Sequence, residues 1–384
     1  MKLKFGLLTR ILVAIIAAVV LGNFVPEWFV RIFATFNGLF GGFLSFVVPL
    51  IIIGFIAPGI AQLGSGSGKL LGLATFSAYF STIIAGLLAY FAASSILPKF
   101  ISEKASTGVE NPNDFLATAF FEVEMIPIMD VMAALLFAFI VGIGMTMIKG
   151  DTLKRGFEEL NSIVEKLITS IIIPLLPFHI FGIFLNMTFA GQVAKIISVF
   201  AVVFVLIIIL HWIMLFIQYV VAGVLNGKNP FKLMKTMLPA YFTAIGTQSS
   251  AATIPVTLRQ AKKTGATDKV TDFTIPLFAT IHLSGSTITI ITCSIGVMLM
   301  NGVDFSFATM FGFIMMLGIT MIAAPGVPGG GVMAAIGLLG SMLGFDETMI
   351  ALMIALYMAQ DSFGTATNVT GDGALAMIVD KFSK

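Results

Sequence analysis

The sequence has little charge, one cysteine and two tryptophans. Only 10% of its 384 residues are Asp, Glu, Lys or Arg, whereas soluble domains carry about 25%, so a soluble globular domain is excluded. The single cysteine, Cys293, excludes an internal disulfide framework. In place of charge the chain is 58% hydrophobic, with 37 Phe and 22 Met, and its mean hydropathy is +1.06. This composition predicts a protein that lies in a lipid bilayer.

Apolar stretches long enough to cross a bilayer as a helix, about 20 residues, recur in the first part of the chain. They lie near residues 8–24, 34–62, 70–97, 127–148, 163–190 and 194–225. We expect conventional membrane-spanning helices there, with the polar segment 101–126 as an extracellular connector.

After Gly227 two apolar segments are interrupted. Polar residues 246–250 break the segment 239–256, and a Pro- and Gly-rich run at 325–331 breaks the segment 305–343. Irregular backbone is tolerated at membrane depth only where it is buried in protein or lines a cavity, so both segments predict re-entrant helical hairpins. Further spans follow them at 273–300 and 347–379. The sequence thus predicts an all-α membrane protein of eight transmembrane helices and two opposed hairpins, an inverted repeat typical of transporters.

The positive-inside rule gives an orientation for this arrangement. With the N-terminus in the cytoplasm and hairpins that insert from opposite sides, 17 of the 21 Lys and Arg residues fall on the cytoplasmic side. The exceptions are Arg31, Lys99, Lys104 and Lys195. We expect a multi-pass protein of the cell (inner) membrane with both termini in the cytoplasm.

The last span carries two acids and an amide. Asp361, Gly364 with Thr365, Asn368 and Asp372 fall on one helix face, because they are spaced at i, i+3/i+4, i+7 and i+11. A carboxylate at mid-membrane costs at least about 2.5 kcal/mol, so such residues are candidates for function. Asp130, near the start of an earlier span, is interpreted as a structural hydrogen-bonding residue.

The span from residue 273 is rich in hydroxyl groups. Thr287 and Thr289 are expected to bond back to carbonyls one turn earlier, whereas Ser286 fits either that role or a functional one. His282 is either a packing residue or a proton carrier. The other two histidines, His179 and His211, lie in spans without polar clusters and are interpreted as packing or interface residues.

The hairpin tips complement these acids. The free N–H groups at the start of the helical arm after the serine-rich tip favour an anion, such as a substrate carboxylate. Asp361 suits an ammonium group. Together these groups describe an α-amino acid.

Four motifs in order along the chain resemble the dicarboxylate/amino acid:cation symporter family, the glutamate transporter homologues. They are QSSAATIP at 248–255, PLFATIH at 276–282, GVPG at 326–329 and NVTGD at 368–372. The run Gln360-Asp361-Ser362 is most similar to the bacterial serine/threonine:sodium symporter branch. The resemblance implies a homotrimer with scaffold helices in 1–68 and 127–191. It also implies a mobile elevator-type transport domain of helix 3 (69–100) and residues 192–384.

The resemblance also implies site residues. The substrate amino group would bind Asp361 and the carboxylate Asn368 with the Ser249 and Ser250 backbone. Ser286, Val327, Gly364 and Thr365 would complete the substrate pocket. Na⁺ ligands would come mostly from backbone oxygens: Phe278, His282 and Asn368 with the carboxylate of Asp372 at one site, and Thr280, Met321, Ile322 and Ala324 at another.

Three departures from the family pattern refine the expectation. Acidic-substrate members carry an arginine where this chain has Gly364, so the substrate is expected to be neutral. The run His282-Leu283-Ser284-Gly285-Ser286 stands where many members have Asn-Met-Asp-Gly-Thr, and the lost acid should weaken a third sodium site. Gln248 also replaces an arginine that prokaryotic members often carry.

The resulting prediction is a Na⁺-coupled symporter of a neutral amino acid resembling serine, threonine or alanine. It would be no enzyme, bind membrane lipid but no nucleic acid, and need no cofactor besides the coupling ion. One alternative is H⁺-coupled or Na⁺-independent transport that uses His282; a channel is another. An intramembrane aspartyl hydrolase is disfavoured, because three helical turns separate Asp361 from Asp372 by about 16 Å and paired catalytic acids share a proton at about 3 Å.

Overall fold

The computed structural model describes residues 7–64, 68–101, 116–191, 193–322, 324 and 328–383. Of these residues 86% are helical, and within the same ranges the chain forms no strand. The all-α prediction is therefore confirmed for this part of the chain. Val327 and most of the expected connector, residues 102–115, lie outside the described residues.

The first part of the chain forms helices that are mostly apolar, with the amphipathic α5 as the exception. They are α1 Leu7–Leu21, α2 Glu27–Gly64, α3 Gly68–Ile101, α4 Val131–Met147, α5 Thr152–Leu167, α6 Ile173–Phe189 and α7 Val193–Asn226, with a π-helical turn at Ile168–Ile172 between α5 and α6. Asp130 is the N-cap of α4, and its carboxylate accepts a hydrogen bond from the Ala133 amide at 2.8 Å. The structural role predicted for Asp130 is confirmed.

The second half of the chain is built from shorter helices and one long one. They are α8 Pro230–Thr247, α9 Ser250–Lys263, α10 Asp268–Ile281, α11 Ser284–Met300, α12 Phe307–Ile322, α13 Gly330–Leu343 and α14 Glu347–Ser383. The helices break where the sequence is interrupted: α8 ends at Thr247, and its C-cap Gln248 has a left-handed φ of 52°. The expected span 273–300 is broken too, because α10 ends at Ile281 and α11 begins at Ser284.

Six helical stretches are long and apolar enough to cross a membrane among the residues that the structure describes. They are Glu27–Ala61, Lys69–Ile101, Thr152–Phe189, Ile197–Asn226, Asp268–Met300 and Glu347–Ser383. The expected spans at 8–24 and 127–148 appear instead as shorter apolar helices, Thr9–Leu21 and Ala133–Met147. Pro26 follows soon after α1, and an irregular stretch up to Asp130 precedes α4, which accounts for the shortening. The chain is a multi-pass membrane protein.

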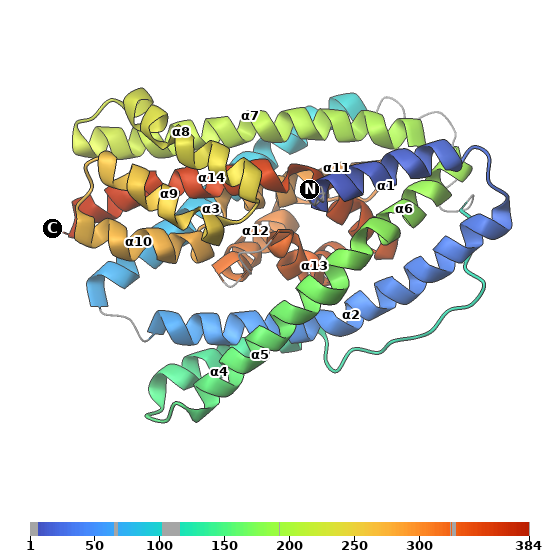
Figure 1. Ribbon diagram of the computed structural model, residues 1–384, viewed down its shortest axis with the longest axis horizontal. Helices are drawn as coiled ribbons and strands as arrows, with labels where there is room; N and C mark the ends of the chain where they lie inside the picture. The colour runs from blue at the N-terminus through green and yellow to red at the C-terminus, as the bar shows by residue number, and fades with distance from the viewer. Residues whose placement is uncertain are drawn as a thin grey trace, which may run out of the picture.

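Helices α11 and α14 form the centre of the second half. Figure 1 shows α14 running beside α7, with α2, α4 and α5 on the opposite side of the molecule. Helices α11 and α14 cross closely, because a Cβ atom added to Gly285 would lie 2.5 Å from the Gly364 carbonyl oxygen. Glycine at 285 therefore allows the two helices to bring their polar residues together.

Candidate functional site

The first polar centre forms where Gly329, the residue before α13, meets α14. The side chain of Asp361 is buried, and its Oδ2 atom accepts a hydrogen bond from the Gly329 backbone N–H at 2.7 Å. Gly329 has a φ of +76°, in the left-handed region that glycine adopts readily. The second interrupted segment is thereby tied to the acid that sequence analysis singled out.

Asn368 lies two turns further along α14 and caps the start of α11. Its Oδ1 atom accepts hydrogen bonds from the backbone N–H groups of Gly285 at 2.8 Å and Ser286 at 3.4 Å. Its Nδ2 atom donates to the Ser286 hydroxyl at 3.1 Å. The first N–H groups of a helix have no intrahelical partner, and here the amide of Asn368 supplies one. The structure thus brings Ser286 and Asn368 together, as predicted for the substrate pocket.

Two other predicted pocket residues lie between these groups on α14. Thr365 is buried. Gly364 faces α11, because a Cβ atom placed on it would lie 3.6 Å from the Ser286 nitrogen, an ordinary van der Waals distance. The space beside Ser286 is therefore not filled by a side chain from position 364.

The first interrupted segment contributes the start of α9. Ser249 is the N-cap of α9 and its hydroxyl accepts a hydrogen bond from the Ala252 amide at 3.3 Å. Ser250 is buried at the first position of the helix, and α9 packs against α14. The structure therefore places both serines at the N-terminus of a helix that packs on α14, and a helix N-terminus can face an anion.

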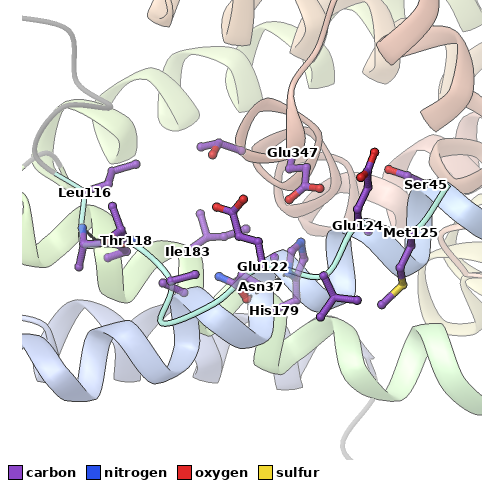
Figure 2. A pocket seen from close by; sticks show the side chains of 18 of the residues that line it. Asn37, Ser45, Leu116, Thr118, Glu122, Glu124, Met125, His179, Ile183 and Glu347 are labelled. Carbon is purple, nitrogen blue, oxygen red and sulfur yellow. Dashed lines mark hydrogen bonds between the residues drawn. The ribbon is translucent and has the colours of Figure 1, made fainter.

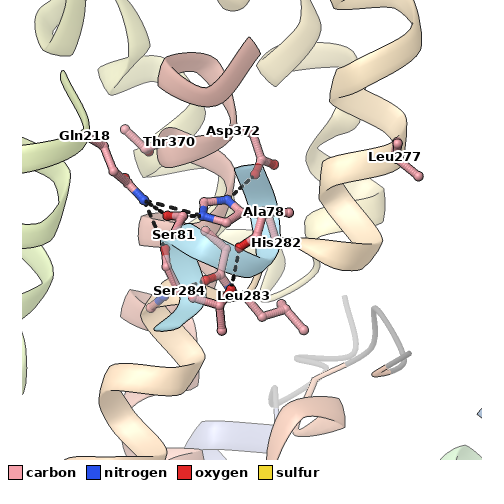
Figure 3. A network of polar contacts seen from close by, with 12 residues as sticks. Ala78, Ser81, Gln218, Leu277, His282, Leu283, Ser284, Thr370 and Asp372 are labelled. Carbon is pink, nitrogen blue, oxygen red and sulfur yellow. Dashed lines mark hydrogen bonds and ion pairs between the residues drawn. The ribbon is translucent and has the colours of Figure 1, made fainter. Parts of the chain in front are cut away.

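The second polar centre lies around His282, in the break between α10 and α11 (Figure 3). The Nδ1 atom of His282 is 2.8 Å from Oδ1 of Asp372, and Nε2 is 3.0 Å from the Ser81 hydroxyl on α3. Gln218 on α7 donates to the hydroxyls of Ser81 at 3.0 Å and Ser284 at 3.3 Å. These side chains are all buried. Four helices thus meet at one histidine.

Asp372 retains one oxygen that suits a cation. Within the described ranges its Oδ2 atom is buried and has no hydrogen-bond partner, and an unpaired buried carboxylate oxygen favours a positive charge. The Phe278 carbonyl, a predicted Na⁺ ligand, already accepts a hydrogen bond from the His282 backbone N–H at 2.9 Å. Because the ring of His282 occupies the other oxygen of Asp372, a cation at this site would share the carboxylate with an imidazole.

The other predicted Na⁺ ligands lie where α10 approaches α12. Thr280 is exposed, and its hydroxyl donates to the Leu277 carbonyl at 2.8 Å. Met321 and Ala324 are buried, with the Ala324 N–H 3.3 Å from the Met321 carbonyl, and Ile322 is half-buried. No group of three or more His, Cys, Asp or Glu side chains is placed to hold a metal ion in the part of the chain that the structure describes.

Besides Ser81, three residues of the two centres were given no polar role by the sequence analysis. Tyr357 donates to the Ser286 hydroxyl at 3.1 Å, and Gln218 belongs to the network around His282. The Nε2 atom of His211 is 3.0 Å from the Gly285 carbonyl oxygen, so this histidine is a polar partner of α11 as well as a packing residue. His211 and Gln218 are seven residues apart on α7, and this helical spacing was a signal that they share a face.

A separate cavity of about 830 Å³ lies between α2, residues 116–125, α6 and the start of α14 (Figure 2). Its lining includes the carboxylates of Glu122, Glu124 and Glu347 together with Asn37 and His179. Glu122 and Glu124 are exposed. Neither Asp361 nor Asn368 lines it, so this cavity is distinct from the two polar centres.

Helical breaks that meet around buried acids in a multi-pass protein define a class, the secondary transporters built on discontinuous helices. The profile of the sodium:dicarboxylate symporter family matches residues 7–382. The chain therefore belongs to the sodium:dicarboxylate symporter family, as the four motifs indicated.

Two individual relatives show how much sequence the chain shares with known proteins. The serine/threonine transporter SstT of Streptococcus thermophilus (strain CNRZ 1066) is 24% identical over 401 residues, which cover 98% of this chain and 96% of the relative. Excitatory amino acid transporter 1 of Rattus norvegicus is 28% identical over 240 residues, covering 62% of this chain and 44% of that protein. The family and both relatives are transporters, and the match to the first relative covers almost the whole length of both chains.

Proposed function

We propose that this protein is a secondary active symporter that carries a neutral amino acid, such as serine, threonine or alanine, with Na⁺. The observation that carries the proposal is that Asp361 and Asn368 lie on one face of α14 and are linked through Tyr357 and Ser286. A carboxylate at one end of this site suits an ammonium group. An amide and helix N–H groups at the other end suit a carboxylate. The serine/threonine transporter among the relatives supports the same substrate class.

The substrate would bind with its amino group on Asp361 and its carboxylate between Asn368 and the start of α9 at Ser249 and Ser250. Ser286, Gly364 and Thr365 would surround its side chain, and Val327 would close the pocket from the second hairpin. Because position 364 is glycine, the pocket offers no fixed cation to a side-chain carboxylate. Aspartate and glutamate should therefore be poor substrates.

Na⁺ would bind beside Asp372, where one carboxylate oxygen has no other partner among the described residues. Backbone oxygens of Phe278, His282 and Asn368 would complete that site, and Thr280 with the backbone near Met321, Ile322 and Ala324 would form a second.

The mechanism would be an elevator motion within a homotrimer. Helices α1, α2, α4, α5 and α6 would be the scaffold, and α3 with α7–α14 the moving domain. Mutual packing of α2 with α4, α5 and α6 supports the first group, and packing of α14 with α7–α11 supports the second. The hairpin of α12 and α13 would be the extracellular gate, since its Gly329 reaches Asp361. Inner-membrane location with cytoplasmic termini belongs to the same proposal.

A second candidate keeps the fold but couples transport to protons. The 2.8 Å contact between His282 Nδ1 and Asp372 Oδ1 favours it, because the imidazole supplies a proton-binding group at the place where a cation would bind. The other ring nitrogen, Nε2, also gives His282 a polar contact with Ser81 on α3.

Uptake of labelled L-serine into proteoliposomes distinguishes the two candidates. Na⁺ and H⁺ gradients are imposed separately, with the membrane potential clamped. A Na⁺ gradient should drive accumulation of serine, and a proton gradient alone should not. Accumulation with protons alone would favour the second candidate, and no uptake of any neutral amino acid would contradict both.

A further inference from the structure

A buried tyrosine lies inside the proposed substrate site. Tyr357 is on α14 one turn before Asp361, and its side chain is 1% exposed. Its hydroxyl donates to the Ser286 hydroxyl at 3.1 Å and also interacts with the Asp361 carboxylate. A buried tyrosine hydroxyl needs polar partners, and here those partners are the groups proposed to bind substrate.

Ser286 connects this tyrosine to the other end of the site. Its Oγ atom accepts from Tyr357 and, at 3.1 Å, from Asn368 Nδ2. Tyr357, Ser286 and Asn368 thus form a continuous polar chain beside the path from Asp361 to Asn368. An amino acid held at both ends would lie with its side chain against two hydroxyl groups.

Position 364 adds no side chain beside this polar chain, because it is a glycine that packs against α11. A Cβ atom at that position would lie 3.6 Å from the Ser286 nitrogen and 3.7 Å from the Thr289 hydroxyl. The second hairpin covers the tyrosine from the other side, because a Cβ atom on Gly331 would lie 2.5 Å from the Tyr357 hydroxyl. The Tyr357 hydroxyl is therefore enclosed between α11, α14 and the start of α13.

We propose that Tyr357 is a specificity-determining residue whose hydroxyl, together with that of Ser286, binds the side-chain hydroxyl of serine or threonine. The proposal rests on the transport function proposed above and deepens it. A substrate hydroxyl can replace the bond between the two protein hydroxyls with bonds to each of them. Alanine offers no such group and separates the two hydroxyls without compensation, and sites built to bond a substrate hydroxyl reject analogues that lack it.

The test compares the ratio of kcat/KM for L-serine to that for L-alanine in full-length protein reconstituted into liposomes. The wild type should prefer serine by at least about tenfold, the value of one hydrogen bond of about 1.4 kcal/mol. Tyr357→Phe should lower that ratio about tenfold through slower serine uptake while alanine uptake persists. Ser286→Ala should lower it in the same direction.

Tyr219→Phe is the matched control. Tyr219 is also fully buried, but its hydroxyl donates to the Thr370 carbonyl at 2.6 Å, away from Ser286. This variant should leave the serine-to-alanine ratio unchanged. An equal loss of serine and alanine uptake in Tyr357→Phe would show a purely structural role and overturn the proposal. If the wild type transports neither amino acid, the transport function itself fails, and with it the specificity role.

Discussion

Asp361 and Asp372 lie on the same face of α14, eleven residues apart, yet they are held in different ways. Asp361 accepts a hydrogen bond from the backbone amide of Gly329 and lies within interaction range of the Tyr357 hydroxyl. Asp372 is bonded to His282, within a network fixed by α3, α7 and α11. In the proposed mechanism, movement of α12 and α13 would free Asp361, whereas freeing Asp372 would displace several packed helices. Under the proposed function, this comparison gives exchange of substrate to Asp361 and a fixed ion or proton site to Asp372.

The largest expected effect is at the exchangeable acid. Asp361→Asn should reduce serine uptake at least about 100-fold, because it removes the buried charge that pairs with the ammonium group. Serine uptake into proteoliposomes is the measurement. Asp130→Asn is the matched control, since Asp130 only caps α4 and its loss should leave uptake near wild type. A comparable loss of serine uptake in both variants would contradict the substrate-binding role proposed for Asp361.

The next effect concerns the fixed acid. His282→Ala leaves Asp372 without its ring partner, and breaking a buried pair costs about 3 to 5 kcal/mol. His179→Ala creates a similar void but removes only a bond to the neutral Asn37. We expect the free energy of unfolding to fall by at least about 2 kcal/mol more in His282→Ala than in His179→Ala. Unfolding in denaturing detergent measures both values. Equal losses would mean that the pair contributes no more than a neutral contact.

A smaller effect tests the crossing of α11 and α14 that aligns both centres. Gly285→Ala should cost about 1–3 kcal/mol, because its Cβ would lie 2.5 Å from the Gly364 carbonyl oxygen and 2.7 Å from Thr367 Cβ. Gly364→Ala meets only contacts of 3.6 Å or longer and should change stability by less than about 1 kcal/mol. The same unfolding assay measures both variants. The reverse order of effects would contradict the described crossing.

The smallest expected effect concerns the hydrogen bond from the Gly329 backbone N–H to Asp361. Gly329→Ala places a side chain at a φ of +76° and 2.7 Å from Met358 Sδ. The backbone strain costs about 1–2 kcal/mol, and the change weakens the bond to Asp361. Hydrogen exchange at the first turn of α13 should accelerate about tenfold, as a loss of 1.4 kcal/mol predicts. Gly344→Ala is the matched control, with a φ of +69° at the other end of α13 and no atom within 4 Å of its added Cβ. In this control, hydrogen exchange at the first turn of α13 should stay at the wild-type rate. Equal acceleration in both variants would contradict a stabilising role for the Gly329–Asp361 bond.

Much of the architecture could be predicted from the sequence. Interrupted apolar segments gave the breaks near Ser249 and Gly329, and the family resemblance is confirmed by the profile match. The spacing of Asp361 and Asn368 correctly placed them on one face, because helical periodicity is a local property.

The partners of these residues could not be predicted in the same way. His282 contacts Ser81 and Gln218, which are 201 and 64 residues away in the sequence, and no local pattern encodes such distances. Tyr357 escaped because a tyrosine in an apolar run looks like a packing residue. Its role appears only when α11 places Ser286 against its hydroxyl.

The most direct test of the division between the two acids is the Na⁺ dependence of serine binding in purified protein. In the wild type, serine affinity should rise between about 5-fold and 150-fold with Na⁺, the usual range for coupled sites. In Asp372→Asn, serine should still bind, through Asp361, but with an affinity that no longer responds to Na⁺. An Asp372→Asn protein that keeps the full Na⁺ dependence would contradict the assignment of the ion site to Asp372.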